Sequence, residues 1–193
     1  MVKYGIIGGR VNFSARDVIV PDPTLEANEI KVGYVLFLEL FKFEIIQMIV
    51  RMKDVTYNDA FEQWSFATTH FDESIWLLMN HYIQKTQPMV IMNRNPSINY
   101  GSLMVFKIKL VERGYHDNMV LYVSIPVLNK FNADFDGDRL NLQSIKIRSH
   151  QKEFVKFLDP RKAMQISRLD GKYDKDLFLI KDQLVGLHLF NSI

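Results

Sequence analysis

The sequence contains no cysteine among its 193 residues. Disulfide bonds, thiolate zinc sites and cysteine nucleophiles are therefore excluded. The sequence also lacks a long uncharged apolar run, because the longest candidate, residues 32–46, is interrupted by Glu39, Lys42 and Glu44. Such a segment is too polar to span a membrane, and no signal peptide is visible. These absences lead us to expect a soluble intracellular protein.

A strong excess of one charge is missing as well. Lys and Arg together number 24 and Asp and Glu 22, which gives a net charge of +2. This near balance argues against a protein whose affinity comes from one large basic surface. It hides an acidic segment, residues 54–92, with five acids and one base, and a basic segment, residues 139–175, with ten bases and four acids. Charge alone favours a solvated helix face over a nucleic-acid site for the basic segment.

What the sequence does have is enough apolar content, 48%, to build a core in one domain or two small ones. Short β-rich runs bounded by turn residues predict strands at residues 16–20, 89–92, 103–111 and 119–125. Apolar residues at helical spacing predict helices at residues 32–52, 69–84, 151–158 and 175–190. Helices inserted among strands without regular alternation favour an α+β or barrel architecture over a doubly wound sheet.

The most informative segment is residues 132–138, Asn-Ala-Asp-Phe-Asp-Gly-Asp, which we call the acidic loop. On a flat strand, the first and last of its three carboxylates would lie roughly 13 Å apart, too far for one small cation to reach all three. We therefore expect the backbone to curl, which Gly137 permits. Without a cation the three acids would repel one another. Oxygen ligands alone point to Mg²⁺ or Mn²⁺ rather than zinc.

Two plainer interpretations compete with a magnesium site. An EF-hand calcium loop starting at Asp134 would need Gly at its sixth position and Glu at its twelfth. The sequence has Arg139 and Ile145 there, so that interpretation fails. A solvated acidic turn stays open on the residues of the loop alone.

The acidic loop matches, residue for residue, the catalytic signature of the largest (beta-prime) subunit of multisubunit DNA-dependent RNA polymerases. Residues 93–97 resemble the family's Asn-Arg-x-Pro-Thr motif, and residues 10–19 resemble its Arg-Val-Asp-Tyr-Ser-Gly-Arg-Ser-Val-Ile segment. Residues 38–41 and 180–187 resemble a conserved helix and a Ser-Gln-Asp-x-Val-Leu-Gly-Leu stretch. All five occur in the family's order, so the resemblance covers essentially the whole chain.

The resemblance implies an α+β fold built on a double-psi β-barrel. Residues 1–31 and 88–148 would form the barrel, residues 32–87 a helical insertion, and residues 149–193 a mostly helical C-terminal segment. It also implies roles for seven residues: Asp134, Asp136 and Asp138 would bind catalytic Mg²⁺, Arg94 and Asn132 would read the sugar of the incoming nucleotide, and Arg10 and Arg16 would contact the template. Without the resemblance, Arg94 would be interpreted as a surface ion pair and the other two arginines as a solvated strand edge.

The implied function is nucleotidyl transfer to the RNA 3′ end within a multisubunit DNA-directed RNA polymerase. The implied partners are other polymerase subunits (the remainder of the beta-prime-like and beta-like chains), the DNA template, nascent RNA and nucleoside triphosphates. The chain lacks the clamp, zinc-binding segments, bridge helix and trigger loop of largest subunits. We therefore expect either a split subunit, from a large bacteriophage and located in the host cytoplasm or packaged in the virion, or an excised fragment.

The sequence departs from the family pattern beside the motifs. The differences are at Gly9, Ala15, Asn99, Tyr100, Arg139 and Leu140. None of them is an expected metal ligand, but they leave two alternatives open. One is a non-catalytic structural or regulatory barrel homologue. The other is an RNA-templated polymerase of the gene-silencing type, which shares an Asp-x-Asp-Gly-Asp loop.

Overall fold

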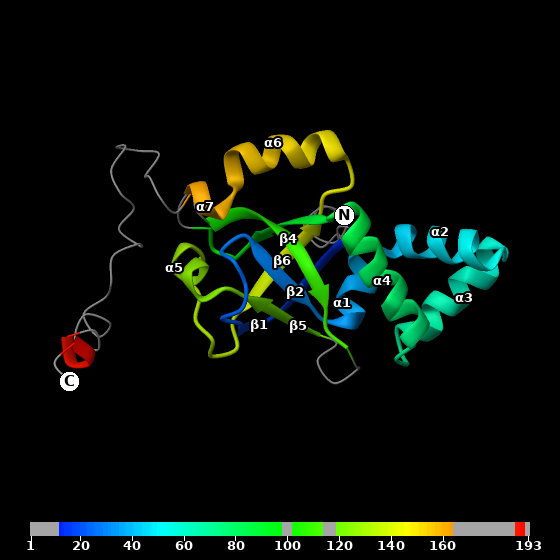
Figure 1. Cartoon of the computed structure of the whole chain (residues 1–193), viewed down its shortest axis with the longest axis horizontal. Helices are drawn as coiled ribbons and strands as arrows, with labels where there is room; N and C mark the ends of the chain where they lie inside the picture. Colours follow the sequence, from blue (N-terminus) through cyan, green and yellow to red (C-terminus); the bar gives the residue numbers. More distant parts are fainter. Residues whose placement is uncertain (1–11, 98–101, 114–118, 164–187, 192–193) are drawn as a thin grey trace, which may run out of the picture.

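The structure is a computed structural model, and it describes residues 12–97, 102–113, 119–163 and 188–191. Six strands close into a barrel in the order β1-β5-β2-β4-β3-β6, with helices packed outside it (Figure 1). The strands are β1 (Ser14–Pro21), β2 (Glu29–Val32), β3 (Met89–Asn93), β4 (Leu103–Val111), β5 (Val120–Val123) and β6 (Arg139–Ser144). The chain is thus an α+β double-psi β-barrel with inserted helices, as the sequence predicts.

Most strands of the barrel pair with partners that are distant in the chain. β1 runs parallel to β5 and antiparallel to β6, with Val18 opposite both Val120 and Arg139. β2 runs parallel to β4 and antiparallel to β5, and β3 lies antiparallel between β4 and β6. The acidic loop directly precedes β6. Its C-terminal end is therefore fixed by the pairing of β6 with both β1 and β3.

The predicted strands correspond closely to those observed. The prediction for residues 103–111 coincides with β4, and residues 16–20 lie inside β1, which ends at Pro21. The prediction for residues 119–125 is too long, because a 3₁₀ turn, η3 (Ile125–Val127), begins where Pro126 removes a backbone donor. The short helix α5 (Leu128–Phe131) follows and leads into the acidic loop.

Four helices are inserted between β2 and β3. They are α1 (Tyr34–Leu40), α2 (Lys42–Lys53), α3 (Tyr57–Ala67) and α4 (Glu73–Thr86). The prediction of one helix over residues 32–52 is wrong, because Phe41 leaves the helical conformation with φ −121° and ψ 30° and separates α1 from α2. The helix predicted at residues 69–84 is α4, which begins later, with Asp72 as its N-cap.

Helix α3 has no counterpart among the predicted helices. Three of its apolar residues, Tyr57, Phe61 and Phe66, are exposed, and the buried ones are Ala60, Trp64 and Ala67, so the apolar residues do not mark a single face. The signal that marks it is a capping box. The Thr56 hydroxyl accepts the Asp59 amide, and the Asp59 carboxylate accepts the Thr56 amide.

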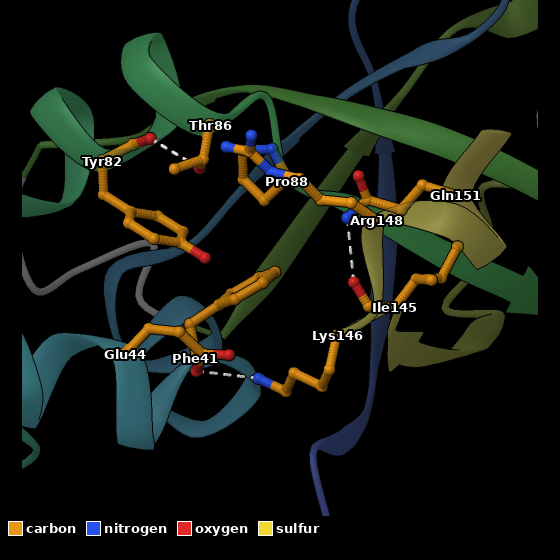
Figure 2. A pocket seen from close by; sticks show the side chains of 9 residues that line it. All are labelled: Phe41, Glu44, Tyr82, Thr86, Pro88, Ile145, Lys146, Arg148 and Gln151. Atoms are coloured by element: carbon orange, nitrogen blue, oxygen red, sulfur yellow. Dashed lines mark hydrogen bonds and ion pairs between the residues drawn. The ribbon is translucent and has the colours of Figure 1, made fainter.

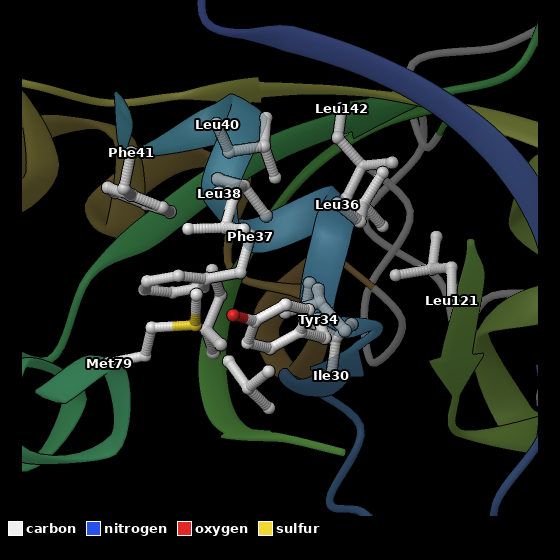
Figure 3. Packing of buried hydrophobic residues seen from close by; sticks show 14 of the residues in the cluster. Ile30, Tyr34, Leu36, Phe37, Leu38, Leu40, Phe41, Met79, Leu121 and Leu142 are labelled. Atoms are coloured by element: carbon white, nitrogen blue, oxygen red, sulfur yellow. The ribbon is translucent and has the colours of Figure 1, made fainter. Parts of the chain in front are cut away.

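One hydrophobic core joins the barrel to the inserted helices (Figure 3). Five of the seven residues of α1 are buried, and its one charged residue, Glu39, is exposed. Phe37 of α1 packs with Met79 of α4 on one side, and the barrel contributes Ile30, Leu121 and Leu142 to the same cluster. The inserted helices therefore form one packed unit with the barrel.

After β6 the chain continues into α6 (Arg148–Leu158) and α7 (Pro160–Ala163), which follow one another along one side of the barrel (Figure 1). The predicted helix at residues 151–158 lies within α6. The predicted helix at residues 175–190 lies mostly outside the described residues. Within the part of the chain that is described, no helix is both long enough and apolar enough to cross a membrane.

Candidate functional site

The acidic loop is held at both ends by backbone hydrogen bonds. At its start, Asn132 is the C-cap of α5 in the left-handed conformation, φ 47° and ψ 47°, and the Ala133 amide donates to the Leu128 carbonyl at 3.3 Å. At its end, the Ile19 amide of β1 donates to the Asp138 carbonyl at 3.1 Å. Gly137 has a φ of +111°, a conformation that other residues rarely adopt. The loop therefore turns as expected and does not extend β6.

Asp138 is the most strongly bound acid of the loop. Its carboxylate accepts the Asp134 amide at 3.0 Å and the Arg94 guanidinium at 2.9 Å and 3.0 Å. The Asp134 amide, and then the Arg94 guanidinium, hold the pKa of Asp138 below its ordinary value, although burial opposes this. The ionised form of Asp138 is therefore favoured at neutral pH.

Arg94 joins two parts of the site that are far apart in the chain. It follows β3, and β3 lies beside β6 with Asn93 opposite Asn141. One end of its guanidinium donates to the backbone carbonyl of Asn132, and the other binds Asp138. The structure thus brings Arg94, Asn132 and Asp138 together. The ion pair expected of an ordinary surface arginine is present, but its partner is the acidic loop itself.

The other two acids of the loop face solvent. Asp134 is exposed and accepts the Phe135 amide at 2.7 Å. Asp136 is exposed and makes no hydrogen bond or ion pair with any described residue. Among the described residues, no three His, Asp or Glu side chains lie close enough together to hold a metal ion. Asp138 is turned toward Arg94 in this arrangement.

Of the two arginines expected to contact the template, Arg16 lies among the described residues and Arg10 does not. Arg16 is exposed on β1, opposite Asn141 of β6, and so lies beside the strand that follows the acidic loop. The position of Arg16 is compatible with a contact to a strand of nucleic acid near the loop, and equally with a solvated strand edge.

Asp17 is a residue beside the site that the sequence interpretation missed. Only 6% of it is exposed, and one carboxylate oxygen is buried without a hydrogen-bond partner. Burial raises the pKa of Asp17, while the Val18 amide and Arg139 act in the opposite direction. Asp17 lies opposite Leu140, two residues after the acidic loop. The sequence signal that could have marked Asp17 is its carboxylate, because the similar segment of the family has serine at this position.

A small pocket lies between the inserted helices and the end of β6 (Figure 2). Lys146 is one of the residues that line it, and its ammonium binds the Glu44 carboxylate at 2.9 Å and the Leu40 carbonyl at 2.8 Å. Burial lowers the pKa of Lys146, and Glu44 partly offsets this. None of the residues that line this pocket belongs to the acidic loop. Lys146 therefore serves to connect β6 with the inserted helices.

Comparison with known proteins gives the family. Residues 8–158 match the family model "RNA polymerase Rpb1, domain 2". The chain belongs to this family. The matched range includes all six strands, all four inserted helices and the acidic loop. The beta-prime-like identity inferred from the motifs is therefore confirmed.

Curated relatives agree with this assignment. The chain is 30% identical over 149 residues to the DNA-directed RNA polymerase subunit beta' of Ureaplasma urealyticum, with 72% of this chain and 11% of the relative covered. It is 30% identical over 138 residues to the beta' subunit of Rhodopirellula baltica, with 72% and 9% covered. It is 27% identical over 168 residues to subunit Rpo1N of Methanococcus vannielii, with 72% and 18% covered. The chain thus spans less than a fifth of the length of these relatives.

Proposed function

We propose that this beta-prime-like chain forms part of the active centre of a multisubunit DNA-directed RNA polymerase. In this proposal the acidic loop supports nucleotidyl transfer to the RNA 3′ end. The observation that carries the proposal is the acidic loop on a closed barrel, with Arg94 bound to both the Asn132 carbonyl and the Asp138 carboxylate. These residues belong to two motifs that are separate in the sequence and that the resemblance connects with one reaction.

The donor set of the loop suits Mg²⁺. Asp134, Asp136 and Asp138 offer oxygen ligands only, and two of these side chains are exposed. They would hold the ion together with waters and substrate phosphates, which usually complete such a site. When bound, one Mg²⁺ would lower the pKa of the RNA 3′-hydroxyl, and a second ion that arrives with the nucleoside triphosphate would stabilise the leaving pyrophosphate. Asp138 would have to share its carboxylate between the ion and Arg94.

Arg94 and Asn132 would bind the sugar of the incoming nucleotide. The Arg94 guanidinium is fixed in direction by its two partners, which leaves its remaining N–H groups as oriented donors. The Asn132 amide is exposed beside it and can both donate and accept. A 2′-hydroxyl also donates and accepts, so this pair could distinguish ribose from deoxyribose. Arg10 and Arg16 would contact template phosphates, which position a strand without reading its sequence.

The chain would act only within an assembly. The proposed partners are the remainder of the beta-prime-like and beta-like subunits, a DNA template, nascent RNA and nucleoside triphosphates. The origin as a split subunit of a large bacteriophage stays a prediction from the resemblance. Purification of the native chain from its source and identification of the proteins that accompany it would test the assembly directly. Purification without any other polymerase subunit would favour the non-catalytic alternative.

The test of the catalytic role is Asp136→Asn in the reconstituted assembly. This change removes one exposed charge and keeps the size of the side chain, so the fold should be unaffected. We expect the rate of nucleotide addition to fall by roughly a hundredfold or more, as for other groups that stabilise charge in a transition state. Asp54→Asn is the matched control, because Asp54 is exposed and has a left-handed conformation that asparagine also accepts.

Two outcomes would contradict the proposal. A normal rate with Asp136→Asn would remove the acidic loop from the reaction. Faster synthesis on RNA templates than on DNA templates would favour the RNA-templated alternative. The control should retain the parent rate, and equal loss in both variants would point to an effect on assembly rather than on the reaction.

A further inference from the structure

Helices α6 and α7 carry exposed cations that lie outside the ion pairs of the described residues. Lys152, Lys156 and Lys162, which we call the α6–α7 lysines, are all exposed, and none of them forms an ion pair with a described residue. Some other cations of the described chain are neutralised, such as Lys31 and Lys109, which are each bound to a carboxylate within 3 Å. The α6–α7 lysines therefore offer positive charge to a partner outside this part of the chain.

These cations lie on two consecutive helices. Lys152 and Lys156 are four residues apart on one helix, about 6 Å along its axis. Lys162 lies on α7, which continues from the end of α6 (Figure 1). Acids are scarce here, because Asp159 is buried and bound to Arg161 at 2.9 Å, and Glu153 is the one exposed acid on α6. Exposed positive charge therefore exceeds exposed negative charge on these two helices.

Arg148 adds a cation one turn before Lys152. It has no ion-pair partner among the described residues. Its guanidinium points toward Thr86, the last residue of α4, and toward Pro88 (Figure 2). This side chain lines the pocket between α4 and α6, so replacing it could disturb packing. Arg148 is therefore kept unchanged in the variants that test the lysines.

An exposed aromatic ring accompanies the lysines. No residue of α6 is fully buried, and the helix packs on β4 through a half-buried face that includes Phe154 and Val155. Phe157 is 54% exposed, and the Lys156 ammonium lies 5.4 Å from the centre of its ring. An exposed ring beside an exposed cation offers a stacking surface as well as charge.

We propose that α6 and α7 bind a single nucleic-acid strand, with the α6–α7 lysines on its phosphates and Phe157 stacked on a base. Sites for single strands combine a basic track with aromatic side chains in this way. The basic segment noted in the sequence is therefore more than a solvated helix face. In the chain the acidic loop precedes β6 and the surface follows it, and the binding test does not depend on catalysis.

The test uses the full chain and a fluorescein-labelled single-stranded RNA of about 20 nucleotides. Its dissociation constant is measured by fluorescence anisotropy from about 50 to about 200 mM KCl. The variant Lys152→Gln/Lys156→Gln/Lys162→Gln should weaken binding roughly tenfold or more and make the salt dependence less steep by about 2 on logarithmic axes, because each phosphate contact contributes about 0.7. Phe157→Ala should weaken binding roughly fivefold or more and leave the salt dependence unchanged.

The matched control is Arg51→Gln/Lys53→Gln/Lys85→Gln. It removes the same charge from three exposed residues on α2 and α4. It should keep the salt dependence of the parent, and thermal melting should show that all variants are folded. The proposal is overturned if the control loses as much affinity as the test variant, or if the parent binds polyglutamate but not RNA, which would indicate an acidic protein partner. Equal binding of duplex and single strand, with no effect of Phe157→Ala, would overturn the assignment to a single strand.

Discussion

Asp17 is the residue whose environment fits its charge least well. Its carboxylate is buried in β1, and one of its oxygens has no hydrogen-bond partner. Because burial raises its pKa, the folded state binds the proton more tightly than the unfolded state does. Protonated Asp17 therefore stabilises the fold fully below the pKa that Asp17 has in the unfolded chain. This stabilisation is lost as the pH rises through the pKa that Asp17 has in the folded protein.

Asp17→Asn should therefore stabilise the protein at neutral pH. The amide keeps an oxygen for the Val18 amide, which donates to Asp17 at 3.1 Å, and carries no charge to be buried. We expect a gain of about 1 kcal/mol in the free energy of unfolding at pH 7. The gain should shrink as the pH falls toward 4. Urea denaturation across this range measures it, and a gain that grows toward low pH would contradict the assigned cause.

The residues of the candidate site differ in how far the sequence alone defines them. The acidic loop stands out by its three carboxylates at spacing two, and its turn at Gly137 follows from elementary geometry. Arg94 does not stand out in the sequence, since it lies 44 residues before Asp138. The two residues meet only because β3 and β6 are neighbours. Its place in the site came from the resemblance. Asp17 could not be found by spacing, because its burial depends on the closed barrel.

At the scale of secondary structure, local patterns predicted four of the six strands closely, whereas β2 and β6 had no predicted counterpart. β4 is correct to the residue because nine consecutive residues with few charges lie between turn segments. The long apolar run before α2 gave no sign of the break at Phe41, since apolar residues on both sides are buried in the same core. Helix α3 was missed because its exposed face is unusually apolar, with Phe61 and Phe66 both exposed.

The capping box of α3 gives a prediction for this element. Thr56→Ala removes the hydroxyl, which accepts the Asp59 amide and donates to the Asp59 carboxylate, whereas the backbone amide of residue 56 can still donate to that carboxylate. We expect a loss of about 1 kcal/mol in the free energy of unfolding. Thr56→Ser keeps the hydroxyl and should retain most of the stability. Equal destabilisation by both substitutions, in urea denaturation, would show that the methyl group matters and the cap does not.

At the scale of the whole molecule, the shared core predicts that the barrel and the inserted helices unfold together. Phe37 of α1 is fully buried and contacts the side chains that join the two parts. The two tryptophans lie in α3 and α4, so their fluorescence reports on the inserted helices, whereas circular dichroism reports on helices and strands alike. Both signals should follow one transition, because a core that is continuous across two parts couples their stability.

Phe37→Ala should destabilise this single unit as a whole. Truncating a buried phenylalanine costs about 3–5 kcal/mol, and both signals should shift to lower urea concentration by the same amount. Phe66→Ala is the matched control, because Phe66 is 59% exposed on α3 and its loss should change stability by less than about 1 kcal/mol. If fluorescence shifted without circular dichroism, the inserted helices would be a separate folding unit. In that case they could detach while the acidic loop, which depends on β1, β3 and β6, kept its place on the barrel.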